Sequence, residues 1–104
     1  MAAVETYLED HFADPITSRT LSDQFGLVPA YLAKLFKEHR GVSPSKYLIN
    51  LRIEKARELM QSQPGLQVKE ISSLVGFGDS LYFSRVFKKE TGIWPTEYLN
   101  SHHS

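Results

Sequence analysis

The side chains of this sequence that are best suited to binding chemistry are basic groups that recur about fifty residues apart. Lys34 and Lys37 lie three residues apart in the first half of the chain, and Arg85 and Lys88 have the same spacing in the second half. A guanidinium group makes two hydrogen bonds to a guanine base, and a lysine ammonium group pairs with phosphate. If each pair lies on one exposed helix face, the pattern indicates contact with a nucleic acid.

Enzyme chemistry has little support in the sequence. We find no glycine-rich phosphate loop, no spaced set of histidine and carboxylate metal ligands and no nucleophile motif. The absence of cysteine excludes disulfides and thiolate metal sites, and it suits a reducing cytoplasm. His102 and His103 are adjacent near the C-terminal end and make a poor metal site. We therefore expect no enzyme activity, no catalytic residue, no metal site and no cofactor.

The composition is that of an ordinary soluble domain. The chain has 104 residues, 41% of them apolar and 23% charged, which predicts one globular domain over residues 1–104 rather than a disordered segment. No apolar run approaches the roughly 18 to 20 residues that span a bilayer. We expect a cytoplasmic protein that makes no contact with a membrane.

The charges are unevenly distributed along the chain. Twelve basic and twelve acidic residues cancel, and zero net charge is weak evidence against binding to nucleic acid. Up to Gln24, however, there is one basic residue, Arg19, against five acidic ones. The remainder holds eleven basic and seven acidic residues, so the basic charge lies away from the N-terminus.

The two halves of the chain form an internal repeat. Leu21, Gly26 and Leu27 correspond to Ile71, Gly76 and Phe77. After a shift of one residue, Tyr31, Phe36, Lys37, Gly41, Pro44, Tyr47 and Leu48 correspond to Tyr82, Phe87, Lys88, Gly92, Pro95, Tyr98 and Leu99. The order and spacing indicate a duplication, although two copies are too few for a solenoid.

Each copy predicts a helix-turn-helix, over about residues 17–39 and about residues 67–90. In the first, Thr17 or Ser18 is a plausible N-cap, and the short helix stops at Gly26. In the second, the short helix opens at Gln67 or Lys69, carries Val68, Ile71, Leu74 and Val75, and stops before Gly76. A glycine there lets the backbone adopt the left-handed conformation that reverses the chain. Either glycine alone would equally suit the end of a helix in a generic bundle; the duplication favours the turn.

The second helix of each copy has a clear division of faces. The inward stripes are Leu32, Leu35 and Phe36 in the first copy and Phe83, Val86 and Phe87 in the second. The outward residues are Ala30, Ala33, Lys34 and Lys37 in the first copy and Ser80, Leu81, Ser84, Arg85 and Lys88 in the second. Tyr31 and Tyr82 adjoin core positions, and we interpret them as packing residues rather than base-stacking ones.

The remaining helices complete an all-α fold of about seven helices, in which a spacer joins two helix-turn-helix subdomains. The spacer covers about residues 43–61, where apolar residues follow a helical period without an internal proline or glycine. Val4, Leu8 and Phe12 form the inward face of an N-terminal helix, and Pro95 begins a closing helix that reaches Asn100.

The length of the spacer suits the geometry of DNA. A helix-turn-helix places its second helix in the major groove, where each base pair shows a distinct pattern of donors and acceptors. A spacer of about 19 residues is roughly 28 Å long, and successive major-groove segments on one face of B-DNA lie about 34 Å apart. We therefore expect one chain to enter two adjacent segments of double-stranded DNA.

The second copy also resembles a known family. The residues that carry the resemblance are Ile71, Val75-Gly76-Phe77, Tyr82-Phe83, Arg85, Phe87-Lys88, Thr91-Gly92 and Pro95 to Tyr98, and the spacer adds Leu48, Arg52-Ile53, Ala56 and Leu59-Met60. Together they closely resemble the signature of the AraC/XylS family of transcription regulators. The resemblance implies a bacterial promoter-binding domain, C-terminal to a sensing or phosphoacceptor domain, that most often activates transcription through RNA polymerase.

The resemblance also implies which residues meet DNA. The base-contacting positions fall on Ala30, Ala33, Lys34, Ser80, Leu81, Ser84 and Arg85. The phosphate-contacting positions expected about one turn further on, or nearby, are Lys37, Arg40, Lys88 and Lys89. Base reading should be stronger in the second copy, because Arg85 suits guanine whereas Ala30 and Ala33 offer only apolar contact.

Two further residues leave alternatives open. Arg52 precedes Glu54 and Glu58, so an ion pair within the helix is favoured over a DNA contact. Trp94 stands where the first copy has Ser43, and it suits packing over the last helix first and a partner contact second. The exposed positions of Leu81 and Trp94, with zero net charge, also suit a helical protein-interaction domain, which salt dependence of DNA binding would separate from a DNA-binding domain.

Overall fold

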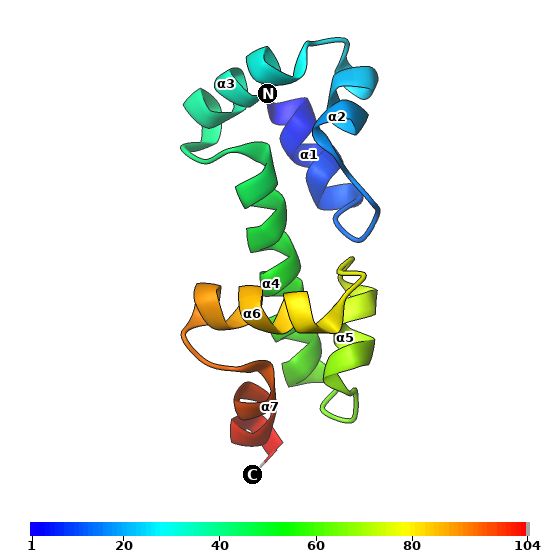
Figure 1. Cartoon of the computed structure of the whole chain (residues 1–104), viewed down its shortest axis with the longest axis vertical. Coiled ribbons are helices and arrows are strands. Elements are labelled where there is room, and N and C mark those ends of the chain that lie inside the picture. The colour runs from blue at the N-terminus through cyan, green and yellow to red at the C-terminus, as the bar shows by residue number, and fades with distance from the viewer. Residues whose placement is uncertain (104) are drawn as a thin grey trace. The chain divides into compact units, whose positions relative to one another are not determined.

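The computed structural model describes residues 1–103, with side chains up to Ser101, and its regular structure is helical throughout. The helices are α1 (Ala2–Asp10), α2 (Ser18–Phe25), α3 (Pro29–Arg40), α4 (Pro44–Ser62), α5 (Val68–Leu74), α6 (Ser80–Thr91) and α7 (Pro95–His103) (Figure 1). Seven helices in the described residues confirm the predicted all-α fold, with two helix-turn-helix subdomains and a long spacer helix, α4. None of the described helices is long and apolar enough to cross a membrane. The side chains of His102 and His103 lie outside the described residues.

The chain divides into two compact units, Met1–Leu51 and Arg52–Ser104, where the sequence predicted one domain. The division falls within α4, so the first unit holds α1, α2, α3 and the beginning of α4. The second unit holds the rest of α4 together with α5, α6 and α7. Each unit therefore contains one helix-turn-helix and a part of the spacer helix against which it packs.

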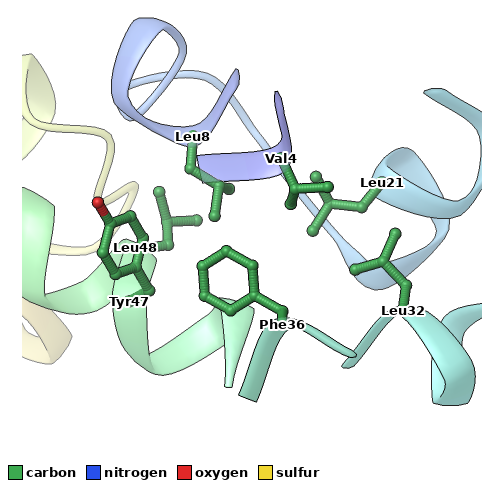
Figure 2. Close-up of a cluster of buried hydrophobic side chains, with 7 residues drawn as sticks. All are labelled: Val4, Leu8, Leu21, Leu32, Phe36, Tyr47 and Leu48. Atoms are coloured by element: carbon green, nitrogen blue, oxygen red, sulfur yellow. The ribbon is translucent and has the colours of Figure 1, made fainter. Parts of the chain in front are cut away.

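The core of the first unit is a cluster of side chains from four helices (Figure 2). It consists of Val4, Leu8, Leu21, Leu32, Phe36, Tyr47 and Leu48. The ring of Phe36 meets that of Tyr47 edge-on, with centroids 5.3 Å apart. Phe12, which we expected inside the first helix, follows the end of α1 and is only partly buried against this cluster.

The core of the second unit repeats this arrangement with more aromatic rings. Its buried apolar residues are Ile53, Ala56, Met60, Ile71, Val75, Phe77, Phe83, Phe87, Tyr98 and Leu99. Phe87 and Tyr98 meet edge-on at 5.6 Å, as the corresponding pair does in the first unit. Leu74 is 54% exposed and does not join the core. Val75 and Ile71 already fill the inward face of this short helix, which leaves Leu74 pointing outward.

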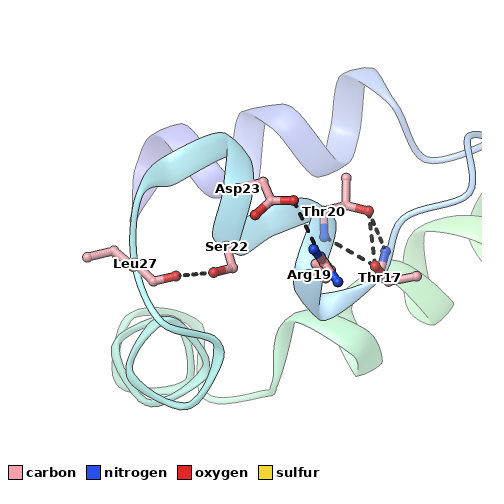
Figure 3. A network of polar contacts seen from close by, with 6 residues as sticks. All are labelled: Thr17, Arg19, Thr20, Ser22, Asp23 and Leu27. Atoms are coloured by element: carbon pink, nitrogen blue, oxygen red, sulfur yellow. Dashed lines mark hydrogen bonds and ion pairs between the residues drawn. The ribbon is translucent and has the colours of Figure 1, made fainter.

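The turn of each helix-turn-helix is held by the same hydrogen bond in both units. The Ser22 hydroxyl donates to the carbonyl of Leu27 at 2.6 Å (Figure 3), and the Ser72 hydroxyl donates to the carbonyl of Phe77 at 3.3 Å. Gly26 at the end of α2 has φ of 69° and Gly76 after α5 has φ of 100°, values that favour glycine over residues with a Cβ. The same hydrogen bond and the same glycine conformation therefore shape the turn between the two helices of each motif.

The helices that precede the turns begin at reciprocal caps. Thr17 is the N-cap of α2: its hydroxyl accepts from the Thr20 amide at 3.1 Å, and the Thr20 hydroxyl accepts from the Thr17 amide at 3.2 Å (Figure 3). Gln67 is the N-cap of α5, where the Glu70 carboxylate accepts from the Gln67 amide at 3.0 Å. Each capping box satisfies amide groups that the first turn of a helix leaves unpaired.

Candidate nucleic-acid interface

Helix α3 presents the outward stripe of the first unit. Val28 is its N-cap without a side-chain hydrogen bond, and Pro29 occupies the first turn, where its missing N–H costs nothing. Ala30 and Lys34 are exposed, as predicted, whereas Ala33 is partly buried. The exposed chemistry of this helix is therefore an ammonium group beside a small apolar surface.

Helix α6 presents a richer stripe in the second unit. Leu81 is 69% exposed and Arg85 is exposed, while Ser80 and Ser84 are partly buried. The predicted base-contacting residues of this helix thus include a guanidinium group, two hydroxyl groups and a leucine side chain. These groups suit hydrogen bonding to base edges and apolar contact with a thymine methyl group.

Asp79 is a residue that the sequence reasoning missed. It is the N-cap of α6, and its Oδ1 accepts from the amide of Leu81 at 2.9 Å and from that of Tyr82 at 3.4 Å. An aspartate directly before a helix is a known capping signal and could have identified it. The cap fixes the turn of α6 that carries Ser80 and Leu81.

The lysines expected to meet phosphate have different surroundings. Lys37 and Lys89 are exposed. The Lys88 Nζ donates to the carbonyl of Gly92 at 2.7 Å and lies 5.9 Å from the centre of the Trp94 ring. Trp94 is itself 42% exposed, so its ring lies outside the core, with the lysine ammonium group near its face.

Arg40 belongs to a network that joins α3 to α1. Its Nε lies 3.4 Å from Oε1 of Glu5, and its guanidinium carbon lies 5.2 Å from the centre of the Tyr47 ring. The second carboxylate oxygen of Glu5 is 3.0 Å from Nε2 of His39, and the Tyr47 hydroxyl donates to Glu5 at 3.2 Å and to Glu9 at 2.8 Å. The Nε of Arg40 is thus engaged with Glu5, while its guanidinium group has further N–H donors.

The network shifts the acidity of its members. The hydrogen bond from His39 is the main reason why the pKa of Glu5 lies below its ordinary value of 4.5, and it acts against burial, which raises that pKa. Burial raises the pKa of Tyr47 well above its ordinary range, and the carboxylates of Glu9 and Glu5 raise it further. Glu5 is therefore charged and Tyr47 is neutral at neutral pH, as a hydrogen bond from the hydroxyl to the carboxylate requires.

Arg52 is partly buried on the spacer helix rather than exposed towards a ligand. Of the acidic residues near it on this helix, Glu54 lies 3.6 Å from Arg57 and Glu58 lies 3.5 Å from Lys55. The Arg52 guanidinium carbon lies 5.5 Å from the centre of the Phe77 ring, and burial lowers the pKa of Arg52. The position points to packing against the helix-turn-helix of the second unit.

Tyr31 and Tyr82, which we expected to pack, keep about half of their surface in contact with solvent. Tyr31 is 50% exposed and Tyr82 is 51% exposed. The Tyr82 ring does pack edge-on against Phe77, with centroids 5.8 Å apart. The packing prediction therefore holds for one side of Tyr82 and leaves the other side open.

Comparison with known proteins gives a consistent result. A family model described as a helix-turn-helix domain matches residues 21–101. The HTH-type transcriptional activator RhaS of Enterobacter sp. (strain 638) is 40% identical over 91 residues, which cover 88% of this chain and 32% of RhaS. The chain thus spans about a third of the length of this curated relative.

Solved structures agree with the family match. The C-terminal domain of AraT, a response regulator from Geobacillus stearothermophilus, superposes with a TM-score of 0.92 at 32% identity, covering 96% of this chain and 83% of that one. The DNA-binding domain of AdpA, solved in complex with a target DNA, has a TM-score of 0.92 over 98% of this chain and 91% of its own, but at 20% identity this likeness shows the fold alone. The predicted resemblance is confirmed: this chain is a helix-turn-helix DNA-binding domain that belongs to the AraC/XylS family of transcription regulators.

Proposed function

We propose that this chain binds promoter DNA sequence-specifically, with α3 and α6 as the two recognition helices. The observation that carries the proposal is the repetition of one device in both units. In each, a serine hydroxyl holds the turn, and the following helix exposes a basic side chain on its outward face, Lys34 in the first unit and Arg85 in the second. A single basic helix face is common on protein surfaces, but the same face after the same bonded turn twice suits two major-groove contacts.

The two helices take unequal shares of base recognition in this proposal. On α6, Ser80, Leu81, Ser84 and Arg85 face the bases, and Arg85 forms two hydrogen bonds to one guanine. On α3, Ala30, Ala33 and Lys34 face the bases, but the alanines supply only apolar contacts. Sequence preference should therefore be strict in the half-site of α6 and loose in that of α3.

Phosphate contacts set the register of both helices in the groove. We assign them to Lys37, Arg40, Lys88 and Lys89, which lie at or beyond the C-terminal part of the base-reading stripes. Arg40 contacts Glu5 through Nε, and Lys88 donates one hydrogen bond to the Gly92 carbonyl, so each side chain has further N–H groups that can donate to a phosphate. Such contacts add affinity without sequence preference.

The length of α4 supports the use of both motifs by one chain. The 19 residues of α4 correspond to about 28 Å of helix, and successive major-groove segments lie about 34 Å apart. We propose that residues 17–39 and 67–90 act as one DNA-binding domain, and that a modest bend in the DNA makes up the difference.

The length of the relatives supports a longer regulator around this domain. Because the chain spans about a third of RhaS, whose name describes an activator, we propose an activator with an additional N-terminal sensing or phosphoacceptor domain. Such a regulator would act in the bacterial cytoplasm and would recruit RNA polymerase to the promoter.

The experiment that tests the proposal selects bound duplexes from a random pool and maps them by footprinting. We expect protection of two successive major-groove segments, with a stricter consensus in one of them. Affinity should fall steeply with salt, because lysine contacts release counterions from several phosphates. Binding that does not change between low and moderate salt would refute DNA binding and favour a protein-interaction domain.

A further inference from the structure

The repeat contains two kinds of tyrosine, an inner pair and an outer pair. The inner pair, Tyr47 and Tyr98, lies at equivalent positions of the repeat and is 8% and 7% exposed. The outer pair, Tyr31 and Tyr82, is also equivalent by repeat and is 50% and 51% exposed. The two pairs differ in the partners of their hydroxyl groups as well as in exposure.

The hydroxyls of the inner pair are satisfied within the protein. Tyr47 donates to Glu5 and Glu9, and its hydroxyl points outward from the first core in Figure 2. Tyr98 accepts from the side-chain amide of Gln61 at 2.8 Å. Within the described part of the chain, the hydroxyls of Tyr31 and Tyr82 form no such bond. The outer pair therefore presents two phenolic donors to whatever approaches α3 and α6.

The outer tyrosines lie on the flank of their helices, and this position indicates which part of the DNA they can contact. On α6, Leu81 points outward and Phe83 is buried, and Tyr82 lies between them around the helix because each residue turns it by about 100°. Ala30, Tyr31 and Leu32 repeat this order on α3. A side chain on the flank of a recognition helix faces the wall of the major groove, and that wall is the sugar-phosphate backbone rather than the bases.

Resting on the proposed function, we infer that the hydroxyls of Tyr31 and Tyr82 each donate a hydrogen bond to a DNA phosphate and thereby fix the depth and register of α3 and α6. Tyr82 is the better-ordered donor, since Phe77 holds its ring edge-on at 5.8 Å. The Arg52 guanidinium, 5.5 Å from the same Phe77 ring, adds positive charge near Tyr82 that favours an anion. The corresponding residue to Phe77 in the first unit is Leu27, which lacks a ring.

The substitutions Tyr31→Phe and Tyr82→Phe test this inference because they remove only the hydroxyl and keep the ring. Each should weaken binding by about 3- to 10-fold, to the selected duplex and to a mixed-sequence duplex alike, with the larger loss at Tyr82. The slope of log affinity against log salt should not change, because a neutral donor releases no counterion. Lysine substitutions change that slope, so the two kinds of phosphate contact are distinguishable.

A second measurement uses duplexes in which single phosphates are replaced by neutral methylphosphonates. At one position in each half of the footprint, the replacement should lower the affinity of the parent protein. The matching phenylalanine variant should bind the modified and the unmodified duplex with nearly the same affinity, because it has no hydroxyl to lose that contact. Tyr98→Phe is the control, because its hydroxyl bonds Gln61 inside the protein. It should lower the thermal midpoint and leave the affinity for DNA unchanged.

The outcomes separate this inference from the proposed function. Suppose that the parent binds DNA with a steep salt dependence and that both phenylalanine variants bind with the same affinity as the parent. The phosphate contact of the tyrosines is then refuted, and the proposed function stands. A loss confined to the selected duplex also refutes it, since a base contact would then be involved. If the parent binds no duplex, both proposals fail together.

Discussion

Arg85 and Lys88 stand three residues apart on α6 and are expected to act on DNA in different ways. Arg85 is exposed on the base-facing stripe, whereas the Lys88 Nζ bonds the Gly92 carbonyl at 2.7 Å near the helix end. A guanidinium group in the groove distinguishes guanine from the other bases, whereas an ammonium group at the backbone recognises charge. The same separation of roles should be visible in their variants.

We predict that Arg85→Ala weakens binding to the selected duplex by about 1 to 3 kcal/mol and relaxes the preference at one base pair. The measurement is a titration of the selected duplex and of variants at each position of the stricter half-site. Lys89→Ala is the matched control, because it removes one positive charge from the same helix and should weaken all sequences equally. Equal losses on selected and random DNA for Arg85→Ala would refute its role in reading bases.

At the scale of the element, α6 depends on the cap that Asp79 provides. Its carboxylate accepts from the amides of Leu81 and Tyr82, which the first turn of the helix would otherwise leave unpaired. Asp79→Ala should lower the free energy of unfolding by about 1 kcal/mol, measured by urea denaturation. Asp79→Asn keeps a capping oxygen and should recover most of that loss. If both variants are equally unstable, capping is not the reason for the loss.

The contact between α1 and α3 depends on Glu5, which pairs with His39 and Arg40. The hydrogen bond from His39 lowers the pKa of Glu5 in the folded protein, so the folded state holds fewer protons than the unfolded state around that pKa. The stability that this pair adds is therefore present above the unfolded value of 4.5 and is lost as pH falls through the lower folded value. The contact between α1 and α3 should weaken in acid.

The corresponding prediction compares thermal midpoints of the parent and Glu5→Gln at several pH values. The parent should be the more stable at neutral pH, and the difference should shrink as pH falls below about 4.5. Asp10→Asn is the control, because this exposed residue of α1 should leave the pH dependence of the parent in place. A difference between parent and Glu5→Gln that is constant down to strong acid would contradict the prediction.

At the scale of the whole molecule, the question is whether both units hold DNA at the same time. Lys37 and Lys88 are equivalent by repeat and lie in different units. If both units bind, Lys37→Ala and Lys88→Ala should each reduce the salt slope by about one, and the double variant should reduce it by about two. Their losses in binding free energy should add, because the two sites share no partner.

The measurement is the salt dependence of affinity for the parent, both single variants and the double variant on the selected duplex. Lys69→Ala serves as the control, since Lys69 lies on α5 and outside both stripes. A single variant with no effect would mean that only one helix-turn-helix is engaged.

The sequence by itself was sufficient for the repeat, the all-α fold, the long spacer helix and the family. These features depend on short-range patterns, because glycine positions, capping residues and the helical period of apolar residues act within a few neighbours. The periodicity also assigned Phe36 and Phe87 to the core and Lys34 and Arg85 to the exposed stripes. Each of these assignments depends only on the direction in which a residue points from its own helix.

Only the tertiary structure decided which partners those side chains have. Glu5 and Arg40 are far apart in the sequence, and no local pattern predicts their contact. Exposure also depends on what lies opposite a helix, which is why Leu74 faces solvent and Tyr31 and Tyr82 are half open although all three adjoin core positions. The outward directions of Lys34, Lys37 and Arg85 thus follow from the sequence, whereas the ion pair between Arg40 and Glu5 arises from packing between α3 and α1, which are distant in the chain.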